Sequence, residues 1–336
     1  MKKALLTGIA GFAGSHILEH LLVNTDYKII GIASWKHKGT PERIEEVLKG
    51  DPTWRDRVEI ITHDLVSPLP ERTKHRIGIC DYILNVAAES HVDRSITDPV
   101  PFVKNNVDLA LNMLEFAREY KPQLFLQFST DEVYGVAPDG VNHPEWSPIV
   151  PSNPYSASKA CQEAIAISYW RTYDVPVVIT NTMNLFAAMQ EPEKYVAQLI
   201  RKVTLGEVVT VHGKEGKIGS RYYLHARNMA DAVLFILRNV KPVMFDGEAN
   251  LPERINIVGD IELDNLAMAK IVAELVGKEL KYVLDDVHAH RPGHDRRYAL
   301  DGTKLRNLGW KAPKTFEESM KDTVDWLKNK DNAIWL

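Results

Sequence analysis

The chain has 336 residues, enough for two domains or one large α/β unit. Its composition, with 45% hydrophobic and 26% charged residues, is typical of a folded protein and excludes a disordered or collagen-like chain. Because 41 basic residues stand against 45 acidic ones, the net charge of −4 offers no basic excess for binding nucleic acid or an anionic membrane.

Short apolar segments alternate with helix-period segments along the first half of the chain. Continuous apolar strands are typical of a parallel sheet covered on both faces, and their alternation with helices indicates a doubly wound, Rossmann-type α/β fold. After about residue 180 the pattern loosens, which predicts a domain over 1–180 and a smaller lobe over 181–336, with an approximate boundary that the chain can cross. The predicted strands are 3–7, 28–32, 58–62, 82–86, 124–129 and 177–180, and the predicted helices are 14–23, 98–120 and 155–174.

The first predicted strand runs into a glycine-rich turn, and a helix pattern follows. Gly8, Gly11 and Gly14 would allow a tight turn, a close approach of the backbone to a pyrophosphate and close packing of the helix. An ordinary turn between strand and helix is the alternative, because the spacing is GxxGxxG. We expect a dinucleotide site at the helix N-terminus, with Phe12 and Ala13 beside the glycines.

No carboxylate follows the second predicted strand, where dinucleotide folds usually place an acid for the adenosine ribose. Ser34, Lys36 and Lys38 instead offer a hydroxyl and two cations to a 2′-phosphate. The segment therefore favours NADP+ over NAD+, with a solvated basic turn as the alternative. Asp64 and Leu65 end the third strand, where they can meet the adenine.

Two further segments carry groups for proton transfer. Tyr155 and Lys159 lie one turn apart on a predicted helix, and an ammonium near a tyrosine lowers the phenol pKa from about 10. Thr130, Asp131 and Glu132 follow a buried strand, at the edge where open α/β sheets bind ligands. Adjacent carboxyl groups can act as general acid and general base. Each segment alone is an ordinary helix start or turn, and it is their coincidence that predicts an active site.

These segments resemble the extended short-chain dehydrogenase/reductase superfamily. Within it, two further segments closely resemble the dTDP-glucose 4,6-dehydratase family, and the likeness spans nearly the whole chain. The Thr-Asp-Glu triplet is its specific part, because related epimerases and decarboxylases generally lack the Asp-Glu pair. The superfamily segments are 7–14, 129–135 and 155–159, and the family segments are 87–96 and 291–299.

The resemblance implies a nucleotide-sugar 4,6-dehydratase with tightly bound NAD(P)+. Tyr155, helped by Thr130 and Lys159, would deprotonate the sugar 4-hydroxyl while hydride leaves C4 for the cofactor. Glu132 would then remove the C5 proton while Asp131 protonates the departing 6-hydroxyl. Return of the hydride to C6 would give the nucleotide 4-keto-6-deoxyhexose.

The resemblance also implies binding residues and leaves the nucleotide base open among thymidine, uridine, guanosine and cytidine. Leu185 stands for an expected asparagine, Phe186 to Ala188 replace a Tyr-Gly-Pro, and Tyr222 and Tyr223 replace an Asp-Trp. The implied cofactor contacts are Ala87, Ala88 and Asn106, besides the residues above. The implied substrate contacts are Ser90, Thr130, Asn184, Lys194, Arg221, Asn256, Arg291 and His294.

Other functions stay open. A sugar-nucleotide 4-epimerase or a decarboxylase of the same superfamily would use Tyr155 and Lys159 but would not need both carboxyl groups. A non-catalytic NAD(P)-binding member is a further alternative. A metal site at His288, His290 and His294 is disfavoured, because the family likeness explains that stretch without a metal.

The remaining features concern location and assembly. Cys80 and Cys161 can form neither a disulfide framework nor a thiolate zinc site, which fits a reducing compartment. No uninterrupted apolar run reaches about 18 residues, so we expect no membrane span and a cytoplasmic protein. Helices 98–120 and 155–174 resemble the pair that forms the family's dimer, which implies a homodimer.

Overall fold

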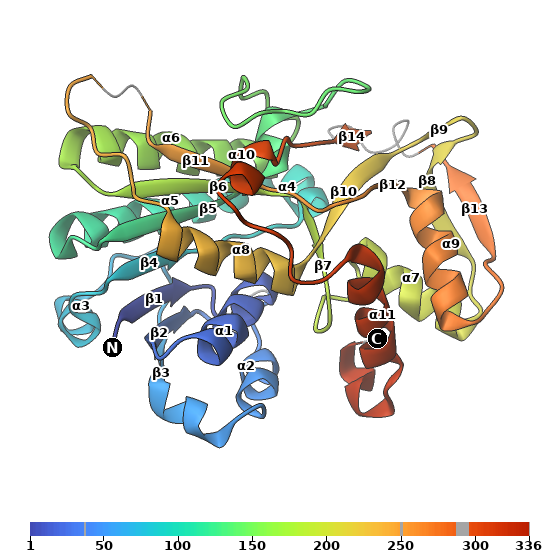
Figure 1. Ribbon diagram of the computed structural model, residues 1–336, viewed down its shortest axis with the longest axis horizontal. Helices are drawn as coiled ribbons and strands as arrows, with labels where there is room; N and C mark the ends of the chain where they lie inside the picture. The colour runs from blue at the N-terminus through green and yellow to red at the C-terminus, as the bar shows by residue number, and fades with distance from the viewer. Residues whose placement is uncertain (37, 249–250, 287–295, 336) are drawn as a thin grey trace.

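The structure is a computed structural model that describes residues 1–36, 38–248, 251–286 and 296–335. Its centre is a seven-stranded sheet in the order β11-β6-β5-β4-β1-β2-β3, with every neighbouring pair parallel (Figure 1). This order confirms the predicted doubly wound fold. The strands are β1 (Lys3–Thr7), β2 (Lys28–Ala33), β3 (Val58–Thr62), β4 (Tyr82–Asn85), β5 (Leu124–Thr130), β6 (Val177–Thr182) and β11 (Glu253–Ile257).

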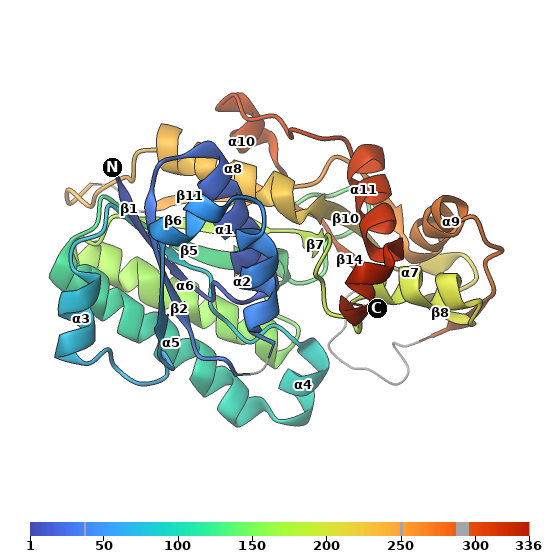
Figure 2. The same cartoon turned by 90° about the horizontal axis from the view of Figure 1, so that it is seen from below.

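Alternate residues of each strand point to opposite faces of the sheet, and different helices cover the two faces (Figure 2). Leu5 and Phe125 pack with Met113 on one side, whereas Leu6 and Leu126 belong to the cluster on the other side. Both faces are therefore buried, which is why these strands carry apolar residues on both faces. The first side carries α3 (Glu71–Ile77), α5 (Pro99–Tyr120) and α6 (Pro154–Tyr173), and the second carries α1 (Phe12–Asn24), α2 (Pro41–Leu48) and α8 (Ala226–Asn239).

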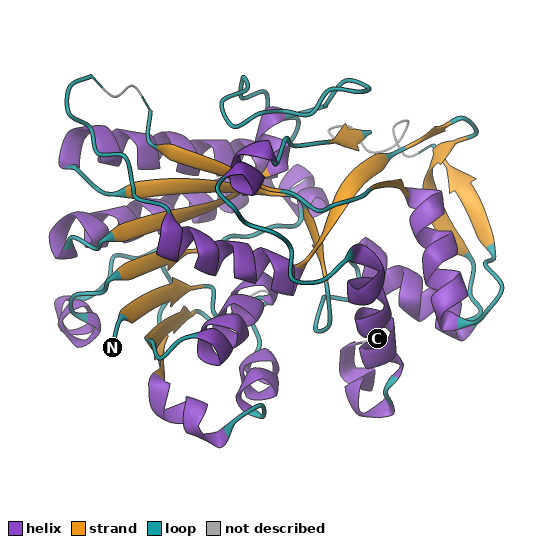
Figure 3. Cartoon of the chain, viewed as in Figure 1, coloured by secondary structure: helices purple, strands orange, loops and turns teal. Residues whose placement is uncertain are grey.

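In the part of the chain that the structure describes, smaller sheets and the helices packed on them form the second lobe (Figure 3). One sheet has the order β12-β10-β14 with β7 paired to β10, and the other has the order β13-β8-β9. Their strands are β7 (Asn184–Phe186), β8 (Val209–Lys214), β9 (Lys217–Ile218), β10 (Ser220–His225), β12 (Glu262–Asp264), β13 (Tyr282–Asp285) and β14 (Arg297–Tyr298). The helices are α7 (Tyr195–Leu205), α9 (Asn265–Val276) and α11 (Phe316–Lys328).

The six predicted strands and three predicted helices are confirmed, whereas β11 was not predicted. It adds to the edge of the main sheet beside β6 after the chain has already built part of the second lobe. Residues 226–239 and 253–257, which form α8 and β11, pack on or join the main sheet although they follow residue 180. A domain boundary at about residue 180 therefore stays a proposal. The remaining short elements are η1 (Pro52–Arg57), α4 (Val92–Thr97), η2 (Asp131–Tyr134), α10 (Thr303–Asn307) and η4 (Lys330–Trp335).

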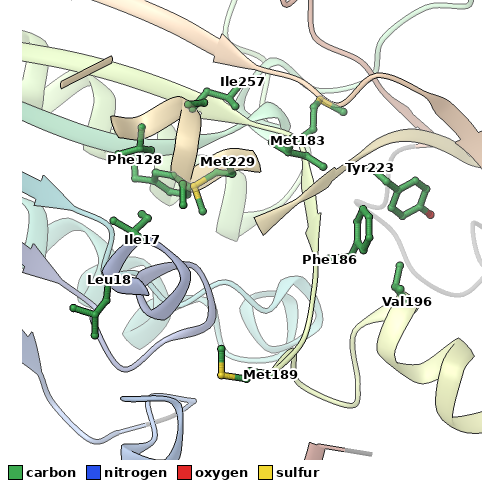
Figure 4. Close-up of a cluster of buried hydrophobic side chains, with 14 of the residues drawn as sticks. Ile17, Leu18, Phe128, Met183, Phe186, Met189, Val196, Tyr223, Met229 and Ile257 are labelled. Carbon is green, nitrogen blue, oxygen red and sulfur yellow. The ribbon is translucent and has the colours of Figure 1, made fainter. Parts of the chain in front are cut away.

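One apolar cluster continues from the sheet into the second lobe (Figure 4). Ile17 and Phe128 of the Rossmann part belong to the same cluster as Met183, Phe186 and Tyr223. Because the two parts share a core, the walls between them are held by packing rather than by a flexible linker. Within the described ranges, no helix combines the length and the apolar character that crossing a membrane requires.

Candidate active site

A large cavity of about 900 Å³ lies between the carboxyl edge of the main sheet and the second lobe. It runs from the glycine turn after β1, past the ends of β4 and β5, to the start of α7 and to β10. This is the edge at which open α/β sheets bind ligands. The volume is sufficient for a ligand larger than a single hexose.

The glycine turn has the tight backbone that a pyrophosphate site needs. Side chains at its glycine positions would collide with neighbouring backbone atoms. Gly8 has a φ of +68°, and a Cβ atom placed there would lie 2.9 Å from the Ala87 Cα atom. A Cβ atom on Gly14 would lie 2.1 Å from the Gly8 carbonyl oxygen. Gly11 is the N-cap residue of α1, so the free N–H groups of the first turn lie at the cavity. A dinucleotide phosphate is the ligand that such a helix end suits.

The basic residues after β2 carry partners that the sequence did not reveal. Lys36 Nζ lies 2.5 Å from Asp64 Oδ2, and this ammonium lowers the pKa of the Asp64 carboxyl. Lys38 Nζ lies 3.0 Å from Glu193 Oε1. Each lysine that was predicted to bind a 2′-phosphate is thus paired with a carboxylate at the rim of the cavity.

The two adjacent acids have different surroundings. Thr130 ends β5 and donates a hydrogen bond of 2.8 Å to Asp131 Oδ1. Asp131 is 3% exposed, and burial, together with the charge of Glu132, raises its pKa to about 7. Glu132 Oε2 accepts hydrogen bonds from Asn153 Nδ2 at 3.3 Å and from the Tyr298 hydroxyl at 3.4 Å. One carboxyl can therefore hold a proton near neutral pH while its neighbour is stabilised as an acceptor.

Tyr155 and Lys159 lie on the first turns of α6 and line the same cavity. Burial, followed by the charges of Glu132 and Asp131, raises the pKa of the Tyr155 phenol. Burial lowers the pKa of Lys159 to about 7. The Lys159 ammonium donates to the Phe128 carbonyl and to Gln162 Oε1, both at 2.6 Å. That this ammonium lowers the pKa of the Tyr155 phenol stays a prediction.

Most of the predicted site residues meet in this cavity. Those that line it are Gly8, Gly11, Phe12, Ala13, Gly14, Ser34, Lys36, Asp64, Leu65, Ala87, Ala88, Ser90, Thr130, Asp131, Glu132, Tyr155, Lys159, Asn184, Lys194 and Arg221. Asn106 lies behind the wall, where its Nδ2 donates to Ser158 Oγ at 2.8 Å and to the Glu89 carbonyl at 3.0 Å. Arg291 and His294 lie outside the described residues, as do His288 and His290.

Asn256 is the predicted substrate contact that the structure places elsewhere. It is fully buried in β11, and its Nδ2 donates to the carbonyl groups of His143 and Asp301 at 3.0 and 3.1 Å. The side chain therefore ties loops to the edge strand of the sheet. The prediction for Asn256 rested on aligned position, which carries no information on side-chain direction, and a substrate contact of Asn256 stays a prediction.

A model of the GDP-mannose 4,6-dehydratase family matches residues 5–323. The chain belongs to the NDP-sugar 4,6-dehydratase family. This confirms the resemblance drawn from the sequence and places the chain in the extended short-chain dehydrogenase/reductase superfamily.

Two similar relatives of this NDP-sugar 4,6-dehydratase family member cover it almost completely. The low-salt glycan biosynthesis protein Agl12 of Haloferax volcanii is 34% identical over 330 residues, which are 97% of this chain and 99% of the relative. The dTDP-glucose 4,6-dehydratase 1 of Escherichia coli strain K12 is 34% identical over 358 residues, covering 99% and 94% of the two chains.

A solved structure agrees in fold. The dTDP-glucose 4,6-dehydratase DesIV of Streptomyces venezuelae, described with NAD and TYD bound, superposes with a TM-score of 0.85 at 29% identity. The superposition covers 99% of this chain and 98% of DesIV.

Sequence reasoning missed three residues around the reacting groups of this family member. Asn153 both caps α6 and donates to Glu132, and the Asn-Pro pair before the helix was a signal that could have identified it. The Tyr298 hydroxyl also contacts Glu132, although Tyr298 follows it by 166 residues. Gln162 contacts Lys159 from the next turn of α6, and an ordinary helix glutamine gives no such signal.

Proposed function

We propose that this protein is a nucleotide-sugar 4,6-dehydratase that converts an NDP-hexose into the NDP-4-keto-6-deoxyhexose. The observation that carries the proposal is the meeting of Asp131, Glu132 and Tyr155 on one wall of the cavity. An epimerase needs the tyrosine but has no elimination to catalyse, so it has no use for an acid and a base in addition. The raised pKa of Asp131 favours a proton donor, and the two donors at Glu132 favour an acceptor.

The cavity fits a nicotinamide dinucleotide at its glycine turn, with the pyrophosphate over the N-terminus of α1 and the adenine near Asp64 and Leu65. A bound nicotinamide would supply the acceptor for the hydride of C4 and the donor of the hydride that C6 receives. Lys159 and Tyr155 lie at the inner end of the same cavity, where they can orient the ribose and the sugar.

The proton steps follow from the surroundings of each group. We propose that Tyr155 takes the proton of the 4-hydroxyl as C4 becomes a ketone. The Lys159 ammonium, one turn along α6, favours the phenolate that this step needs and opposes the effect of burial on the phenol pKa. Glu132 takes the proton of C5, which the ketone acidifies, and Asp131 gives its proton to the 6-hydroxyl, so that water leaves. Glu132 then returns its proton to C5.

One turnover leaves Tyr155 protonated and Asp131 ionised, so one proton must pass between them before the next. Thr130 is placed for this transfer, because its hydroxyl donates to Asp131 Oδ1 and its hydrogen bond with the Tyr155 phenol counteracts the rise of the phenol pKa. The sum of the steps is the loss of one water molecule.

The far end of the cavity is cationic and suits a nucleoside diphosphate. Arg221 on β10 and Lys194 at the start of α7 both line it. The Arg221 guanidinium lies 5.5 Å from the centre of the Tyr298 ring, which keeps its planar group at the cavity wall. We propose that these two cations bind the diphosphate and that Asn184 and Ser90 contact the sugar.

The experiment that tests this function is mass spectrometry of the protein incubated with a panel of NDP-hexoses, each also prepared with deuterium at C4. We expect one of them to lose one water molecule while its deuterium appears at C6, because the same hydride leaves C4 and returns to C6. An inverted C4 without a mass change, or the loss of carbon dioxide, would instead indicate an epimerase or a decarboxylase. Retained cofactor without any reaction would indicate a non-catalytic binder.

We propose NAD+ as the resident cofactor. The sequence favoured NADP+, but Lys36 and Lys38 are each matched by a carboxylate, which would repel a 2′-phosphate. Protein denatured after purification is expected to release NAD+, identified by chromatography and mass spectrometry. Release of NADP+ would restore the preference inferred from Ser34 and the two lysines.

We also propose a homodimer formed through α5 and α6, as the family resemblance implies. Apolar side chains that are exposed in the single chain are present on both helices. Leu111 and Val100 of α5 are 38% and 66% exposed, and Tyr173 of α6 is 41% exposed. A second copy would cover this surface.

A further inference from the structure

A row of buried polar side chains crosses three neighbouring strands behind the wall of the active site. The Thr7 hydroxyl on β1 donates to Asn85 Oδ1 at 3.0 Å, and Asn85 Nδ2 on β4 donates to Gln127 Oε1 at 2.9 Å. Gln127 Nε2 on β5 then donates to Gln162 Oε1 on α6 at 3.1 Å. All four side chains are fully buried. The three strand residues are direct partners in the register of the sheet, so the row follows the hydrogen-bonding direction.

The row ends at Lys159. Lys159 Nζ donates to Gln162 Oε1 and to the Phe128 carbonyl, both at 2.6 Å. Gln127 Nε2 donates to the same two acceptors, at 3.1 and 3.3 Å. Gln162 Nε2 is also occupied, because it donates to the Asn106 carbonyl of α5 at 2.6 Å. Two of the three ammonium protons are thereby directed into the protein, and the third is left for the cavity that Lys159 lines.

Only one orientation of the two glutamine amides satisfies this arrangement. If the Gln162 amide were turned over, its NH₂ group would face the donors of Lys159 and Gln127, and its oxygen would face the Asn106 carbonyl. If the Gln127 amide were turned over, it would present its NH₂ group to the Nδ2 donor of Asn85. Unsatisfied polar groups at buried positions cost free energy, so both amides keep the orientation in which every donor faces an acceptor.

We propose that Gln162 is a positioning residue that fixes the Lys159 ammonium for the reaction, and that the row from Thr7 ties this position to the glycine turn. Thr7 immediately precedes Gly8, and its hydroxyl oxygen also accepts the N–H groups of Val86 and Ala87 at 3.0 Å. The cofactor turn and the catalytic lysine are thus set by one buried network. The proposal rests on the role of Lys159 in the proposed function.

The Gln162 Oε1 acceptor also affects whether Lys159 is charged. Burial lowers the pKa of Lys159, and the Glu163 carboxylate on the same helix opposes that shift. Glu163 is itself paired with Arg254 at 2.6 Å, and the other ionisable neighbour on α6 is the Tyr155 phenol. An oxygen that accepts from Nζ stabilises the ammonium over the neutral amine. Removing it is therefore expected to lower the pKa of Lys159 further.

The test is Gln162→Met, which keeps the side-chain length but removes both the acceptor and the donor. In protein as purified, without added cofactor or substrate, we expect the unfolding free energy to fall more at pH ~5.5 than at pH ~8.5. A fall of about one unit in the pKa of Lys159 makes this difference about 1.4 kcal/mol. In the dehydration assay the alkaline limb of the kcat profile should move to lower pH by the same amount, with KM nearly unchanged.

A second variant and a control separate positioning from a loss of packing. Gln162→Glu keeps an acceptor at Lys159 and adds a negative charge, so the alkaline limb should move to higher pH. Asn228→Leu removes a buried amide of α8 that donates to the Lys314 carbonyl at 2.8 Å, outside this cavity, and its cost should be the same at both pH values. Asp131, which titrates in the same range, is present in every variant, so differences between them report Lys159.

The proposal is supported if the alkaline limb of the kcat profile moves to lower pH in Gln162→Met and to higher pH in Gln162→Glu. It is overturned if the limb moves in the same direction in both variants, or if the pH dependence of both equals that of the wild type and the control. If Gln162→Met does not fold, the direction of the Gln162→Glu shift decides. If the wild type dehydrates no sugar nucleotide, the proposed function fails, whereas the pH dependence of unfolding still reports whether Gln162 holds the Lys159 ammonium.

Discussion

Replacement of Asp131 by asparagine is expected to slow the loss of water by about 10²- to 10⁴-fold, the usual contribution of a general acid. The amide oxygen can still accept from the Thr130 hydroxyl, but the side chain no longer has a proton to give to the departing 6-hydroxyl. Oxidation at C4 does not need this proton. The 4-keto hexose and the reduced nicotinamide should therefore accumulate, which the absorbance of the reduced cofactor measures directly.

The pH profile of the wild type tests the same assignment. Since burial raises the pKa of Asp131 to about 7, the protonated fraction is complete well below pH 7 and falls tenfold per pH unit well above it. The rate of dehydration should fall on the alkaline side accordingly. Asp131→Asn should lose the part of this fall that comes from Asp131 and keep the part that comes from loss of the Lys159 ammonium. Asp260→Asn, at a carboxyl outside the cavity, is the control and should keep the wild-type profile. An Asp131→Asn enzyme that dehydrates at the wild-type rate would falsify the assignment.

Stability provides a check that the variant is folded. A carboxyl with a raised pKa holds its proton in the folded protein at pH values where the unfolded chain has already released it. Asp131 therefore lowers the free energy of unfolding progressively as the pH rises from about 4 to the folded pKa of about 7. Removing the ionisable group removes this penalty, so Asp131→Asn should be more resistant to denaturant than the wild type at pH ~8.

The sequence sufficed for those parts of the fold that depend on local pattern. Strand β5 is buried along all seven residues, and its apolar residues lie on both faces of the sheet, which is the mark of a central parallel strand. Strand β11 is buried over its last four residues, but only Ile255 and Ile257 are apolar, so its sequence does not look like a strand of this kind. Nothing local tells it to pair with β6 across the 70 residues that separate their ends. Its place is fixed by pairing and by the cluster shared with α8, which are properties of the whole chain.

The same distinction explains the site. The glycine turn and the Thr130 to Glu132 triplet were found because each is one short segment whose neighbours in sequence decide its geometry. The partner of Lys38 is Glu193, which lies far along the chain and comes next to Lys38 only in the folded protein. A lysine was therefore interpreted as a free cation when the fold supplies its counter-ion, and this is why the cofactor preference changed.

The largest expected effect on stability is at the ion pair behind the catalytic turn. Glu163 Oε2 lies 2.6 Å from Arg254 Nη2, and both side chains have no exposed surface. Arg254 Nη1 also donates to the Tyr134 hydroxyl at 3.0 Å, and Tyr134 is the last residue of η2, which carries Asp131 and Glu132. The ion pair therefore stabilises η2, the turn that carries Asp131 and Glu132.

Glu163→Gln is expected to lower the unfolding free energy by about 3–5 kcal/mol, because it leaves the buried guanidinium without its counter-charge. Denaturant titration measures this loss. The double variant Glu163→Met with Arg254→Met should cost much less than the sum of the single changes, since it leaves no buried charge. Asp325→Asn, which breaks the exposed pair with Lys321, should change stability by less than about 1 kcal/mol. A cost for Glu163→Gln no larger than that of Asp325→Asn would show that water reaches the pair and that η2 is held by packing alone.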